Sequence, residues 1–137
     1  MTDSGRPRMR DFRARGIAEI VIGAIYLAAG ILFFLALLPD ADVLFFVPVA
    51  LVGAIAIIDG IGTVRAAEPS ASWWRWPHLW LMFVAALVAF AGSIVVFIVD
   101  LPDRAGVGFA LALILWVLGA VPLIIGLRTA RDMRADR

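Results

Sequence analysis

Two carboxylic acids stand inside long apolar stretches of the sequence, and their chemistry is the most informative in the chain. Glu19 lies between Ala18 and Ile20, and Asp59 lies between Ile58 and Gly60. A charge within a membrane is costly and therefore often functional. If these acids meet, with the Tyr26 hydroxyl nearby, repulsion and desolvation would make one of them hold a proton. The sequence thus predicts a candidate intramembrane polar site of Glu19, Asp59 and Tyr26, built around a proton-responsive pair of acids.

In a second interpretation, each acid forms an ion pair with an arginine at the membrane interface. Arg15 precedes Glu19 by one helical turn, and Arg65 follows Asp59 closely. Such ion pairs would need no proton chemistry. Both interpretations share one depth estimate: a tight turn centred between residues 40 and 41 would bring Asp59 opposite residue 22, within about one turn of Glu19.

The elements that must position these acids are four apolar runs. The chain has 137 residues, 64% of them hydrophobic, whereas a soluble domain is nearer half apolar. A helix of about 20 apolar residues crosses a bilayer. We expect an all-α, four-helix transmembrane bundle of two helical hairpins over residues 17–127, with an N-terminal tail at 1–16 and a C-terminal tail at 128–137. The four predicted spans are 17–38, 43–64, 78–99 and 107–127.

The arginines predict how the helices are oriented. All 12 basic residues are arginine, and all but Arg104 fall in the two tails or in the connection between the second and third runs. The positive-inside rule places such segments in the cytoplasm. We therefore expect both termini to be cytoplasmic, in a multi-pass protein of a bacterial cytoplasmic membrane. The two outer connections share the triplet Leu-Pro-Asp, at 38–40 and 101–103, which is compatible with a duplicated hairpin and equally with a simple four-helix bundle.

Small residues predict which helix faces pack together. Helices in lipid associate where small side chains let their backbones approach. In the first run, glycines recur every seven residues, and Glu19 and Tyr26 fall on the same stripe. The third run has small residues every four positions. The predicted helix-packing residues are Gly16, Gly23, Gly30, Ala85, Ala89 and Ser93.

A tryptophan cluster begins just before the third run. Indole rings favour the headgroup region of a bilayer, so the cluster is interpreted as an anchor; a docking patch or lipid-headgroup site with Arg75 is the alternative. The predicted anchors are Trp73, Trp74, Trp76 and Trp80. The expected partners are the lipid bilayer itself and either a second copy of the chain or another membrane protein.

Several function classes find no support in the sequence. There is no cysteine and a single histidine, His78, so we expect no metal site and no disulfide. No nucleophile, base and acid constellation is present, and we expect neither an enzyme nor a cofactor. The tails also contain acids that offset part of their positive charge: Asp3, Asp11, Asp132 and Asp136. We therefore do not expect nucleic acid as a partner.

The first hairpin resembles the HdeD-type acid-resistance membrane proteins, mainly over residues 13–65. The likeness rests on Arg15-Gly16-Ile17-Ala18, on the glycine-spaced helix and on Ile58-Asp59-Gly60-Ile61. That family usually has six helices, and here Pro122-Leu123 replaces the second acid-glycine pair. The resemblance implies a stress-related membrane protein without catalysis. The leading prediction is therefore a small non-enzymatic structural or stress-related membrane protein; the alternative is a transport component, as a small oligomeric carrier or an accessory subunit.

Overall fold

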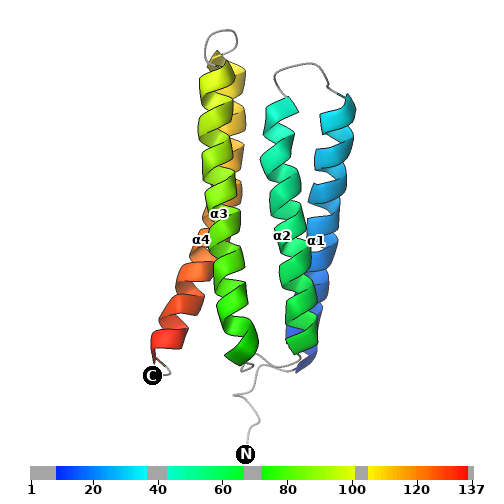
Figure 1. Cartoon of the computed structure of the whole chain (residues 1–137), viewed down its shortest axis with the longest axis vertical. Coiled ribbons are helices and arrows are strands. Elements are labelled where there is room, and N and C mark those ends of the chain that lie inside the picture. The colour runs from blue at the N-terminus through cyan, green and yellow to red at the C-terminus, as the bar shows by residue number, and fades with distance from the viewer. Residues whose placement is uncertain (1–8, 37–42, 67–71, 101–104, 136–137) are drawn as a thin grey trace, which may run out of the picture.

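The protein is a bundle of four long helices, seen in a computed structural model that describes residues 9–36, 43–66, 72–100 and 105–135 (Figure 1). Each helix contains most or all of one apolar run of the sequence. Their bounds are α1 Met9–Ala36, α2 Val43–Ala66, α3 Ser72–Asp100 and α4 Ala105–Ala135.

All four helices are long and apolar enough to cross a membrane. Their outward surfaces are apolar too: Leu32, Leu87 and Val117 are about two-thirds exposed. Water would not tolerate so continuous an apolar surface on a monomer, whereas lipid chains cover it at no cost. The chain therefore has the form of a multi-pass membrane protein.

The helices extend beyond the apolar runs at one end of the bundle. There α1 begins at Met9 and α4 continues to Ala135, so much of both predicted tails is helical. The tryptophan cluster lies in the first turns of α3. We call this the arginine-rich end: α1 and α3 begin there, α2 and α4 end there (Figure 1), and it carries Arg13, Arg15, Arg65, Arg75, Arg128, Arg131 and Arg134. The Leu-Pro-Asp triplets lie outside the described residues.

Close contact between glycines joins α1 to α2. A Cβ added to Gly23 would lie 2.6 Å from the carbonyl oxygen of Gly53, and one added to Gly60 would lie 2.6 Å from that of Gly16. Gly30 packs in the same way against Ala50. The glycine stripe of α1 thus faces α2, with backbone directly against backbone.

The other helices pack less intimately. Ala89, fully buried on α3, lies against Gly119 of α4, and Gly92 of α3 packs on Pro48 of α2. The α1 backbone runs beside that of α2 and, over the described residues, comes close to neither α3 nor α4. The bundle is therefore open along one side, between α1 and α4.

This packing sets the depth of the two acids. Because a Cβ added to Gly60 would meet both the carbonyl oxygen of Gly16 and the backbone nitrogen of Ile20, Asp59 lies level with residues 17–21 rather than with residue 22. Glu19 is at the centre of that range. The two acids are therefore closer in depth than a tight outer turn would predict, and both lie toward the arginine-rich end.

Candidate functional site

Among the described side chains, the most deeply buried ionisable group is paired with the single histidine of the sequence. Asp59 is 1% exposed, and its Oδ1 lies 2.7 Å from Nδ1 of His78. The two residues come from neighbouring helices, α2 and α3. Asp59 is seven residues from the end of α2 and His78 six from the start of α3, so the antiparallel arrangement places them at one depth. Asp59 thus pairs with a histidine and not with the Arg65 expected from the sequence.

Glu19 has the arginine neighbour that its spacing predicted. The Nε of Arg15 donates a hydrogen bond of 2.9 Å to Oε1 of Glu19, one turn along α1. The Arg15 side chain is 49% exposed and that of Glu19 is 23% exposed. A partly exposed pair at this spacing stabilises a helix only weakly. Its larger effect here is to place one positive charge beside the acids.

Glu19 and Asp59 line a common cavity of about 230 Å³, which we call the acidic cavity. All four helices contribute to it. Tyr26 completes its polar lining, so the three residues of the predicted polar site are brought together. His78 stands behind Asp59 and does not line the cavity. The apolar walls include Val52, Ala56, Met82, Ala85, Leu118 and Pro122.

Each carboxylate presents one oxygen that has no hydrogen-bond partner among the described residues. Oδ2 of Asp59 and Oε2 of Glu19 are both buried and unpaired. Buried polar atoms are nearly always satisfied, by protein, water or a ligand. Two such oxygens on the lining of one cavity indicate a position where a proton, a water molecule or a cation would be bound.

The charges around the cavity do not balance when His78 is neutral. Glu19 and Asp59 supply two negative charges, and Arg15 supplies one positive charge. The lining contributed by α4 is entirely apolar. An imidazolium at His78 would supply the missing positive charge. The net charge of the site therefore depends on whether one or both ring nitrogens of His78 carry a proton.

The other predicted residues lie where packing or the interface uses them. Ala85, Ala89 and Ser93 are buried on α3, and Ala85 also lines the acidic cavity. Near the arginine-rich end, three of the tryptophans are exposed, whereas Trp74 packs its ring against Gly62 of α2. The exposed tryptophans are Trp73, Trp76 and Trp80.

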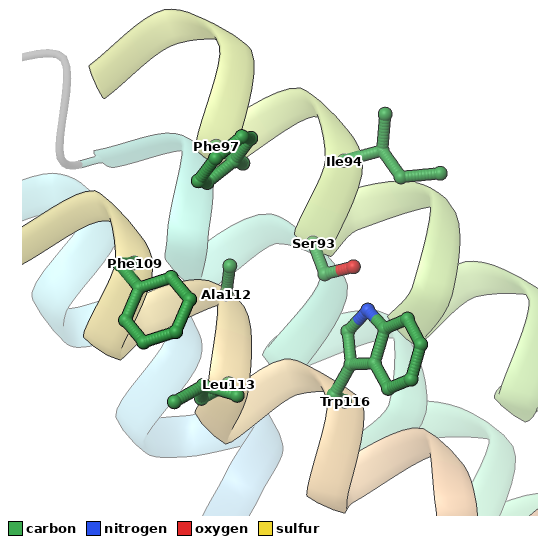
Figure 2. Close-up of a pocket in the computed structure, with 7 residues that line it drawn as sticks. All are labelled: Ser93, Ile94, Phe97, Phe109, Ala112, Leu113 and Trp116. Atoms are coloured by element: carbon green, nitrogen blue, oxygen red, sulfur yellow. The ribbon is translucent and has the colours of Figure 1, made fainter. Parts of the chain in front are cut away.

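A second pocket, of about 310 Å³, lies between α3 and α4 away from the arginine-rich end (Figure 2). None of its seven lining residues is charged. The hydroxyl of Ser93 on its wall already donates to the carbonyl oxygen of Phe90, at 2.7 Å. This pocket offers no group that exchanges a proton, and the acidic cavity remains the candidate site. Over the described residues, no three acids or histidines gather as metal ligands.

Sequence reasoning missed His78 as a member of the site. As a lone histidine it had no apparent partner. The signal that could have found it is depth: counted from the connection between α2 and α3, Asp59 and His78 stand at similar distances along antiparallel helices. No family model, curated protein or solved structure matches this chain. The functional proposal therefore rests on the geometry of the site.

Proposed function

We propose that this is a small, non-enzymatic, multi-pass protein of a bacterial cytoplasmic membrane, made of two helical hairpins with both termini in the cytoplasm. The supporting observation is that every arginine whose side chain is described lies at the arginine-rich end. The positive-inside rule assigns that end to the cytoplasm. The pairing of α1 with α2 and of α3 with α4 agrees with two hairpins.

Within this frame we propose a proton-responsive transport component, as a small carrier or an accessory subunit. The observation that carries the proposal is the hydrogen bond between Asp59 and His78, 2.7 Å long and buried within the span. An ionisable pair at that depth is costly to maintain and is typical of proton relays. Packing alone would be served as well by two apolar side chains.

Asp59 connects two environments. On one side it is held by His78, which stands roughly 9 Å along α3 from its first residue and is 13% exposed. On the other side it lines the acidic cavity. A proton arriving from the arginine-rich end would be taken up at Nε2 of His78, the ring nitrogen that does not contact Asp59. The resulting imidazolium neutralises Asp59, and losing the proton leaves the cavity with one excess negative charge.

Proton movement in vesicles tests this function. Liposomes containing the protein and an internal pH dye should dissipate an imposed pH gradient several-fold faster than liposomes carrying the double variant Glu19→Gln, Asp59→Asn. The variant must remain monodisperse, and Asp132→Asn, an exposed acid on α4, serves as the matched control. Equal rates for the wild type, the double variant and empty liposomes would contradict a transport role.

A structural or stress-related role is the second candidate, and the exposure of α1 favours it. Of the four spans, α1 is the least buried, with 11% of its most apolar window inside the bundle. Its outward face is thus available to a second copy or to another membrane protein. Purification in mild detergent with a fixed stoichiometric partner, and no proton flux in liposomes, would favour this candidate over the transport role.

A further inference from the structure

The polarity of the acidic cavity's lining changes along the helix axes. Its lining near the arginine-rich end carries Glu19 and Asp59, whereas Tyr26, Val52 and Leu118 line it farther into the span. Glu19 and Tyr26 are two turns apart on α1, which is about 10 Å. A molecule that filled the cavity would thus meet negative charge at one end and apolar side chains at the other.

The groups that face Asp59 define the charge such a molecule must bring. Arg15, Glu19 and Tyr26 face the site from α1, and His78 faces it from α3, while α4 contributes apolar side chains only. With His78 neutral, one negative charge has no counter-charge among the described residues that line or pair with the site. The buried, unpaired oxygens of Asp59 and Glu19 would attract a cation placed between them.

The cavity opens toward lipid and not only toward water. The backbones of α1 and α4 do not approach one another over the described residues. Ile22, Tyr26 and Val121 line the cavity and are each between 38% and 55% exposed, which places them at a mouth between these two helices. Since this mouth lies within the membrane span, molecules that partition into the bilayer reach it directly.

We propose that the acidic cavity binds a small organic cation, a substituted ammonium with an apolar body, in place of the proton on His78. The ammonium group lies between Glu19 and Asp59, and the apolar body extends toward Tyr26 and Leu118. The exchange with a proton rests on the proposed function; the cation site itself does not, because it follows from the two carboxylates and the cavity.

The volume of the cavity limits the size of the cation. A dry cavity of roughly 150 Å³ accommodates benzene, and the acidic cavity is about 230 Å³. One aromatic ring with a short ammonium-bearing arm therefore fits, and the Tyr26 ring offers an aromatic surface for it. The chosen probe is benzyltrimethylammonium, whose charge does not change with pH. Neopentylbenzene, which has the same shape without the charge, is its matched neutral control.

Equilibrium dialysis of labelled benzyltrimethylammonium against the protein in phosphatidylglycerol nanodiscs tests the proposal. We expect saturable binding that Asp59→Asn and Glu19→Gln each weaken at least about tenfold, because a buried charge loses its counter-charge. Asp132→Asn should bind as the wild type does. In the wild type, excess neopentylbenzene should fail to displace the cation to any comparable extent, a comparison that needs no variant to fold. Equal binding by folded Asp59→Asn, or equally effective neutral displacement, would overturn the proposal.

Two further binding measurements distinguish the cation site from the proton function and from binding of a lipid headgroup. Cation binding that weakens as the pH is lowered supports exchange with a proton. Asp59-dependent binding that is the same at low and high pH supports the cation site and overturns the proton function. Nanodiscs that also contain phosphatidylethanolamine identify the source of the ammonium group. Weakened binding there assigns the site to lipid headgroups, and unchanged binding assigns it to free cations.

Discussion

Replacing Gly23 with leucine should separate α1 from α2 and leave little folded protein. Even a single Cβ at Gly23 would lie 2.6 Å from the carbonyl oxygen of Gly53 and 2.9 Å from the backbone nitrogen of Ile57. Overpacking usually costs about 1–3 kcal/mol, and the atoms in the way here are backbone, which cannot rotate aside. We expect a loss at or above the top of that range, measured as the midpoint of unfolding by sodium dodecyl sulfate in mixed micelles.

The neighbouring position supplies the control for this prediction. Ala24 is exposed on α1, so Ala24→Leu adds the same side chain on the lipid-facing surface and should leave the midpoint nearly unchanged. Because Glu19 shares the glycine stripe, Gly23→Leu should also remove α1 from the acidic cavity and abolish its binding of cations. A Gly23→Leu midpoint equal to that of Ala24→Leu would mean that the α1–α2 contact is not the one described.

Replacing His78 with phenylalanine should destabilise the bundle by about 3–5 kcal/mol, the usual cost of leaving a buried charge without its partner. Asp59 would then have neither oxygen hydrogen-bonded, since Oδ2 is already unpaired and Oδ1 bonds to His78. The same detergent titration measures the loss. Glu19 lies in the same cavity and would add to the penalty through repulsion.

Removing both members of the pair should restore most of that stability. The double variant Asp59→Leu, His78→Phe removes the whole pair, and apolar replacements of buried ion pairs are often neutral or stabilising. The coupling between the two sites, obtained from the double-mutant cycle, should therefore be large and of opposite sign to the single losses. Simple additivity of the two single substitutions would show that the pair is not formed.

The sequence predicted the four spans because each depends on a local property, a run of apolar residues long enough to cross a bilayer. Gly16, Gly23 and Gly30 formed one visible stripe for a similar reason, since their spacing is that of a single helix. The sequence of α1 alone could not predict which helix this stripe contacts. Gly53, which packs against Gly23, draws attention only once the two helices are aligned.

The composition of the candidate site was only partly predictable. Glu19 and Asp59 stood out because charges are rare in apolar runs. The pairing of Asp59 with His78 depends on how α2 and α3 are rotated about their axes, and that rotation is set by contacts such as Gly92 on Pro48. The acidic cavity exists because α1 does not close against α4, a property of the whole bundle that no single segment encodes.

The protonation state of His78 tests the central claim most directly. It is the only histidine in the sequence, so nitrogen-15 labelling of histidine gives one imidazole in the spectrum of the protein in nanodiscs. We predict that Nδ1 carries a proton that it donates to Oδ1 of Asp59, and that Asp59→Asn shifts the Nδ1 resonance. An imidazole with a bare Nδ1, or one whose Nδ1 resonance is the same in Asp59→Asn, would contradict the Asp59–His78 pair on which the proton-responsive site depends.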